Sequence, residues 1–180
     1  DRNRAGVAAM RDFADLRWQE TVRQYLNSLD PNMPVKIAVV HWGSEGVFET
    51  DPRQEERSRQ LLALGFDAIV GHHPHRLQGI EVKNGRVIAY SLGNFVHTTE
   101  SVWGKRSILL QLRVTPWGIV DGQVIPMEIE DGIPKTAQGT ERQEILSKVR
   151  SLSQALGTSM DADGHFWIGA VYQREAAKNF

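Results

Sequence analysis

The sequence contains no cysteine, so neither a disulfide bond nor a thiolate metal site can form in it. It also lacks any apolar run near the ~20 residues that a helix needs to cross a bilayer. Neither sign of charge dominates: 21 basic and 22 acidic residues give a formal net charge of −1. Such a balance offers no broad electrostatic footprint for nucleic acid, and we expect no nucleic-acid partner.

The length and composition are those of one globular domain. The chain has 180 residues, of which 41% are hydrophobic and 24% are charged. We therefore predict a single domain over residues 1–180. The first residue is aspartate and not methionine, so a leader or membrane anchor could have been removed upstream.

The first 70 residues predict a strand–helix–strand unit. The patterns favour, in order, a loose lead-in (1–10), a helix (11–29), a strand (35–40), a helix (52–64) and a strand (68–70). Asp51 and Gln54 form a capping box at the start of the second helix, and Gly65 is placed to end it. A strand, a helix and a strand within ~35 residues favour a parallel pair with a right-handed crossover.

The remaining chain changes to an antiparallel pattern. Strands are predicted at 79–82, 87–92, 107–114 and 119–129, with short turns at 83–85 and 115–118. An amphipathic helix is predicted over 140–156, with Thr140 and Gln143 as its capping box. The fold class is therefore α/β, with one βαβ unit followed by antiparallel strands and a C-terminal helix.

His41 and Glu45 form the first candidate site. His41 directly follows a predicted buried strand, and ligands of open α/β sheets bind at the carboxyl ends of strands. An imidazole and a carboxylate together suit a divalent transition metal. A histidine at a strand end beside a solvated glutamate is the alternative.

The strongest signal is the segment Gly71-His72-His73-Pro74-His75, which follows the second predicted strand. The βαβ unit would bring it to the same edge of the sheet as His41. Because proline restricts the backbone, His73 and His75 could hold their rings in set directions. Each could bind one of two metals about 3.5–4 Å apart, the spacing of two-metal hydrolases. The alternative is a polar loop.

Asn94 is the third candidate. It lies in Tyr90-Ser91-Leu92-Gly93-Asn94-Phe95, again at a strand end, and could orient a substrate oxyanion or a ligand histidine. A turn-forming asparagine is the alternative. We interpret His97 as a supporting neighbour of the site and His165 as a structural or surface residue.

Three motifs together resemble the bacterial capsule-synthesis family, which includes the poly-γ-glutamate capsule biosynthesis proteins. They are His41-Trp42-Gly43-Ser44-Glu45, Val70 through Glu81 and Ile88 through Val96, and the resemblance extends over roughly residues 35–160. It implies a calcineurin-like metallophosphatase sandwich, of which this chain is similar to the carboxyl-terminal half.

The same resemblance implies roles for individual residues. His41 would be a metal ligand, His73 and His75 would be the final ligand pair, and Glu45 would be a ligand or a general acid/base. The position of His72 is ambiguous between ligand and neighbour. The resemblance also implies upstream ligands, but no histidine precedes His41 and no Gly-Asp pair occurs in residues 1–34. The chain would then carry only part of the ligand set.

Two functions follow as hypotheses. The first is a metal-dependent hydrolase of the phosphoesterase type in capsule or poly-γ-glutamate biosynthesis, with Glu45, His75 and Asn94 as catalytic residues. The metal set His41, Glu45, His72, His73 and His75 would bind Mn, Zn or Fe, with two ions in a complete domain. The second is a non-catalytic assembly factor that binds an anionic polymer or membrane-bound capsule machinery. In both, we expect an extracytoplasmic or membrane-anchored location in the cell envelope, with the anchor outside this chain.

Overall fold

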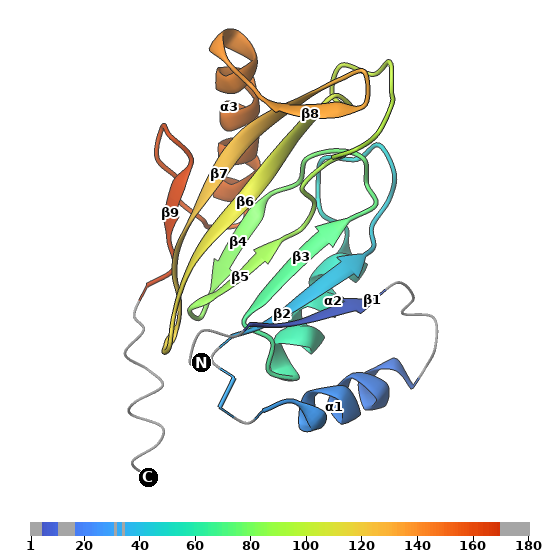
Figure 1. The fold of residues 1–180 in the computed structure, drawn as a ribbon, viewed down its shortest axis with the longest axis vertical. Coiled ribbons are helices and arrows are strands. Elements are labelled where there is room, and N and C mark those ends of the chain that lie inside the picture. The colour runs from blue at the N-terminus through green and yellow to red at the C-terminus, as the bar shows by residue number, and fades with distance from the viewer. Residues whose placement is uncertain (1–4, 11–16, 31, 34, 170–180) are drawn as a thin grey trace.

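The computed structural model describes residues 5–10, 17–30, 32–33 and 35–169 (Figure 1). Its elements are β1 (Ala5–Met10), α1 (Trp18–Ser28), β2 (Val35–His41), α2 (Pro52–Ala63), β3 (Ala68–His72), β4 (Ile80–Lys83), β5 (Arg86–Ala89), β6 (Arg106–Thr115), β7 (Gly118–Glu130), β8 (Ile133–Thr136), α3 (Gly139–Ala155) and β9 (His165–Trp167). They form two sheets, so the α/β class is confirmed.

The first sheet has the strand order β1-β2-β3-β5-β4. The first four of these strands run parallel, and β4 is antiparallel to β5. The predicted unit β2-α2-β3 is therefore confirmed. The lead-in assigned to 1–10 was wrong, because residues 5–10 form a strand that pairs with β2 from Ala5↔Val35 to Met10↔Val40. A run of small residues carries little strand signal by itself, and pairing with a buried neighbour supplies the stability.

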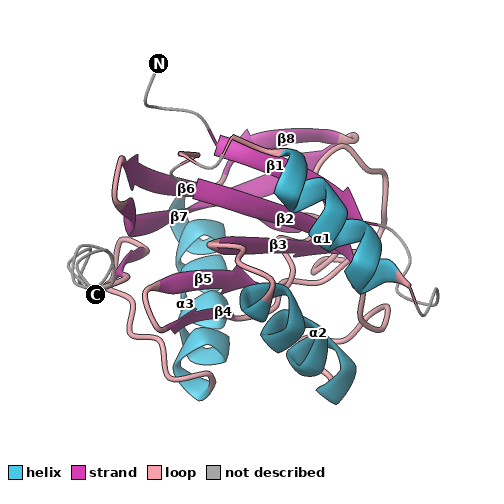
Figure 2. Ribbon diagram, turned by 90° about the horizontal axis from the view of Figure 1, so that it is seen from below, coloured by secondary structure: helices cyan, strands magenta, loops and turns pink. Residues whose placement is uncertain are grey.

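The side chains of the central strands alternate between two hydrophobic clusters. On β3 and β5, Ala68 and Val87 belong to one cluster, whereas Ile69 and Ile88 belong to the other. This alternation follows from the two-residue period of a strand. The cluster that contains Ile69 also includes residues of α1 and α2, which lie on the same side of the sheet in Figure 2. The second sheet and α3 contribute to the cluster that contains Ala68.

The second sheet is antiparallel and has the order β6-β7-β8, with β9 pairing to β7. The predicted hairpins β4-β5 and β6-β7 are confirmed, whereas β8 and β9 were not predicted. Helix α3 begins at Gly139 with Gln138 as its N-cap and without a side-chain cap. The predicted capping box at Thr140 was therefore wrong, because Thr140 already lies inside the first turn.

Two hydroxyls attach α3 and the turn after it to the first sheet. The backbone N–H of Ile80 donates to Ser153 Oγ at 2.9 Å, and that of Val82 donates to Thr158 Oγ1 at 2.7 Å. Both hydroxyl side chains are buried. The helix predicted over 11–29 is present from Trp18 onward, and residues 11–16 lie outside the described part. Among the helices that the structure describes, none has the length and apolar character needed to cross a membrane.

Candidate metal site

The carboxyl ends of β2 and β3 bring the two histidine segments together. His41 and His72 are the last residues of these strands and are register partners. Their ring centroids lie 4.9 Å apart, and the His73 ring lies 4.3 Å from that of His41. The prediction that the two segments meet at one edge of the sheet is thus confirmed.

Three side chains form a compact group of donors. One donor atom from each of Glu45, His73 and His75 lies within 4.8 Å of the other two. Both histidines are half-buried and Glu45 is exposed, so the group is open to solvent on one side. His41 and His72 are adjacent to this group but are not part of it.

The backbone around Pro74 holds the two histidines in unusual conformations. His73 has φ 105° and His75 has φ 53°, values in the left-handed region that residues other than glycine rarely adopt. Such a conformation costs of order 1–3 kcal/mol and persists only where surrounding contacts fix it. One such contact joins the two loops, since Gly46 N–H donates to the Pro74 carbonyl at 2.8 Å.

Two buried glutamines support the loop that carries Glu45. The predicted capping box is confirmed: Asp51 accepts from the N–H of Gln54, and Gln54 Oε1 accepts from the Asp51 N–H. The remaining amide group, Gln54 Nε2, donates to Gln78 Oε1 at 2.8 Å. Gln78 Nε2 in turn donates to the carbonyls of Val47 and Glu49. The loop from residue 41 to residue 51 is therefore anchored from the protein interior.

The hydrogen bond with Asn94 fixes which ring nitrogen of His75 carries the proton. Its Nδ2 donates to the Gly104 carbonyl at 2.9 Å, so its Oδ1 is the atom that faces His75 Nδ1, at 2.5 Å. An amide oxygen can only accept, and His75 Nδ1 must therefore carry the proton. In the neutral tautomer that this bond selects, the lone pair that a metal requires is on His75 Nε2. Of the two roles considered for Asn94, this geometry favours the orientation of a ligand histidine.

Arg76 and His97 contact His75 from two further directions. Arg76 Nη1 donates to the His75 carbonyl at 2.8 Å, and its Nη2 donates to Ser101 Oγ at 3.1 Å. The exposed ring of His97 stacks on that of His75 at 5.2 Å with an interplanar angle of 28°. Arg76 was not singled out from the sequence, although a cation directly after the histidine segment was a signal that could have identified it. His165 lies exposed on β9 in the other sheet.

Beside the strand ends that carry the histidines, Trp42 packs against Tyr90 and Gly71. Trp42 Nε1 donates to the Tyr90 carbonyl at 2.8 Å, and the two rings stack at 5.8 Å. A Cβ on Gly71 would lie 2.1 Å from the Tyr90 carbonyl oxygen, so only glycine fits there. Burial raises the pKa of the Tyr90 phenol above its ordinary value of 10.0, and the neighbouring Glu81 adds to the shift. Because its ring stacks on Tyr90 and its Nε1 is hydrogen-bonded, Trp42 is a core residue.

The donor set fits a divalent transition metal. Two imidazoles and one carboxylate are a common ligand combination for such ions, and three protein ligands leave further positions open. The hydrogen bond from His75 to Asn94 is the kind of outer contact that ligating histidines generally make. The residue types of this group are therefore those that bind a divalent metal.

The fold is thus a mixed α/β domain whose candidate metal site, a histidine–carboxylate group, lies at the carboxyl edge of a parallel sheet, where open α/β sheets bind ligands. A match to a known protein family identifies this domain more closely than its fold does. The family described as "Bacterial capsule synthesis protein PGA_cap" matches residues 2–99, more than half of the chain. The chain belongs to this bacterial capsule-synthesis family, as its motifs indicated.

Curated relatives agree with this assignment. The chain is 37% identical over 117 residues to the capsule biosynthesis protein CapA of Bacillus anthracis, covering 63% of this chain and 28% of that protein. It is 43% identical over 102 residues to the PGA biosynthesis protein CapA of Bacillus subtilis, covering 56% and 26%. A probable polyglutamine synthesis accessory protein of Mycobacterium tuberculosis is 26% identical over 166 residues, covering 87% and 43%. The chain thus spans less than half the length of each of these relatives.

Proposed function

We propose that this chain forms part of a metal-dependent hydrolase of the phosphoesterase type that acts in capsule or poly-γ-glutamate biosynthesis. The biosynthetic role is supported by the family and by the names of the Bacillus relatives. The hydrolase site rests on one observation, the convergence of donor atoms from Glu45, His73 and His75 within 4.8 Å. The metallophosphatase-like sandwich implied by the motifs is part of the same proposal.

Each residue has a distinct role in this proposal. His73, His75 and Glu45 hold a divalent metal, with His41 and His72 beside them at the strand ends. A bound Mn, Zn or Fe ion would supply Lewis-acid polarisation of a substrate oxygen. In its alternative role, the exposed Glu45 acts as a general acid that gives its proton to the leaving-group oxygen of the phosphoester. Asn94 keeps the His75 proton on Nδ1.

A second ion would need donors beyond this group of three. In the proposal these come from elsewhere in the full protein, as the resemblance implies, and the complete domain acts on a phosphoester or an anionic polymer in the cell envelope. Contact with membrane-bound synthesis machinery would belong to the same location.

Metal content of the purified full protein provides the test. We expect a divalent metal by elemental analysis, and we expect His75→Ala to lower both the metal content and the hydrolysis of a generic phosphodiester by tenfold or more. His165→Ala is the matched control, because it removes an exposed histidine from the other sheet. An unchanged metal content in His75→Ala would refute the ligand assignment.

The second candidate is a non-catalytic factor that binds the polymer during assembly. It is favoured by the word "accessory" in the name of the Mycobacterium relative. It predicts polymer binding that persists after chelation of metals, together with no hydrolysis in the presence of any divalent ion. Loss of binding on chelation would exclude it.

A further inference from the structure

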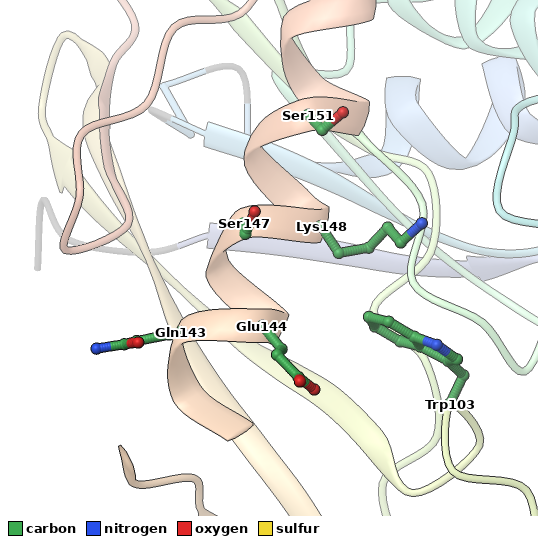
Figure 3. Close-up of a pocket in the computed structure, with 6 residues that line it drawn as sticks. All are labelled: Trp103, Gln143, Glu144, Ser147, Lys148 and Ser151. Atoms are coloured by element: carbon green, nitrogen blue, oxygen red, sulfur yellow. The ribbon is translucent and has the colours of Figure 1, made fainter. Parts of the chain in front are cut away.

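A groove runs along the exposed face of α3 opposite the loop that carries Trp103 (Figure 3). It has a volume of about 520 Å³ and is lined by Trp103, Gln143, Glu144, Ser147, Lys148 and Ser151. Figure 3 shows the Lys148 side chain extending from α3 toward the Trp103 loop. The proposed hydrolase site uses none of these residues.

Aromatic rings hold the Lys148 ammonium in place. Lys148 Nζ lies 4.6 Å from the centroid of the Phe48 ring and 5.3 Å from that of Trp103. The two rings contact each other edge to face at 5.3 Å. Cation–π attraction orients an ammonium without neutralising its charge. In the part of the chain that the structure describes, Lys148 makes no ion pair with a carboxylate, so its charge is available to a ligand.

The other charges at the groove compensate each other. Glu144 forms a salt bridge with Arg106, whose guanidinium also lies over the Trp103 ring at 4.5 Å. The groove therefore retains a net charge of about +1, which comes from Lys148. Ser147 and Ser151 lie one helical turn apart beside it and offer hydroxyl donors.

This donor set fits a carboxylate better than the alternatives. One ammonium with neutral hydroxyls matches a single negative charge, whereas phosphate monoesters carry nearly two at pH 7. Cations already lie over the Trp103 ring, which leaves it poorly suited to stack on a sugar. Phe48 belongs to the same loop as Glu45, so this loop contacts the groove at one position and the histidine group at another.

We propose that the α3 groove is a binding subsite for the free carboxylates of an acidic polymer, separate from the histidine group. The identification of the ligand as a polymer rests on the proposed role in poly-γ-glutamate biosynthesis, whereas the preference for carboxylates rests on the groove. Lys148 is the central contact, Ser147 and Ser151 donate hydrogen bonds, and Trp103 forms the opposite wall.

Binding of a fluorescently labelled deca-glutamate to the full protein, followed by anisotropy at low ionic strength, tests the proposal. We expect Lys148→Gln to weaken binding about fivefold, as the loss of one charged contact implies. Ser151→Asp should weaken it similarly by placing a like charge in the groove. Lys135→Gln is the matched control, because Lys135 is an exposed lysine paired with Glu130 on the second sheet, and it should bind as the parent does.

The outcomes separate this proposal from the metal site. His75→Ala should lose metal but keep deca-glutamate binding, and Lys148→Gln should keep metal. Deca-glutamine should not bind, and inorganic phosphate should compete less well than the monocarboxylate butyrate. Equal binding by Lys148→Gln and the parent, when circular dichroism shows that both proteins are folded, would overturn the proposal. Equal binding of deca-glutamine, or stronger competition by phosphate, would also overturn it.

Discussion

Replacement of Asn94 by alanine is the most informative single change, because it removes two hydrogen bonds with different consequences. The first is the bond to the Gly104 carbonyl, and the second is the bond to His75 Nδ1. Loss of the first leaves a buried acceptor unsatisfied, at about 1–3 kcal/mol. Loss of the second adds about 1 kcal/mol, so we expect unfolding in urea to become easier by about 2–4 kcal/mol.

The same variant should weaken metal binding about 10- to 100-fold, the usual effect of removing a group that orients a ligand histidine. Asn94→Asp separates the two contributions. A carboxylate can still accept from His75 Nδ1 but cannot donate to the Gly104 carbonyl, so stability should fall while metal affinity stays near that of the parent. Titration calorimetry with Zn²⁺ or Mn²⁺ measures the affinity. If Asn94→Ala binds metal as tightly as the parent, the inference about the His75 proton is wrong.

Three further changes test the packing around the site. Gly71→Ala should lower stability by about 3 kcal/mol, because the new methyl group meets the Tyr90 carbonyl and Trp42 Nε1. Gln54→Ala should cost about 2–3 kcal/mol in urea, since Gln78 Oε1 loses its buried donor. The raised pKa of Tyr90 predicts that stability holds below pH 10 and then falls as the pH rises, by up to about 1.4 kcal/mol per unit. The reason is that the unfolded phenol loses its proton while the folded one keeps it.

Each of these three predictions has a control variant. A Cβ on Gly104 has side-chain atoms of Thr99 and Ser101, and no backbone atom, as its three nearest neighbours, so Gly104→Ala should lower the melting temperature less than Gly71→Ala does. The control for Gln54 is Gln60→Ala, which breaks side-chain hydrogen bonds within α2 to Glu56 and Arg57 and should lower stability less than Gln54→Ala does. Tyr90→Phe should flatten the loss of stability at high pH, and an equally steep loss in that variant would contradict the pKa argument.

The meeting of the histidine segments could be predicted from sequence because it depends on topology alone. Two buried strands joined by one helix must run parallel, so the residues that end them lie at one edge. The choice among His72, His73 and His75 could not be made that way. It depends on positive φ values on both sides of Pro74 and on the carbonyl contact with Gly46, neither of which leaves a pattern in the sequence.

The misses have a common physical origin. Residues 5–10 are mostly small and give little local signal, whereas 165–167 are too few to show a strand periodicity, so both are strands because of their partners, β2 and β7. The predicted N-cap of α3, Thr140, lies two residues after the observed N-cap, Gln138. The contact between Phe48 and Lys148 joins positions 100 residues apart, and no periodicity reveals such a pair.

The two hydroxyls that reach β4 from α3 and its following turn have a consequence for aggregation. β4 is the last strand of its sheet. Without other partners, the N–H groups of Ile80 and Val82 on its outer side could form hydrogen bonds with a strand of another chain. Ser153 and Thr158 occupy those donors from within the same molecule. A chain truncated before residue 150 would expose this edge, and its insolubility would then reflect intermolecular strand pairing and not the loss of the histidine group.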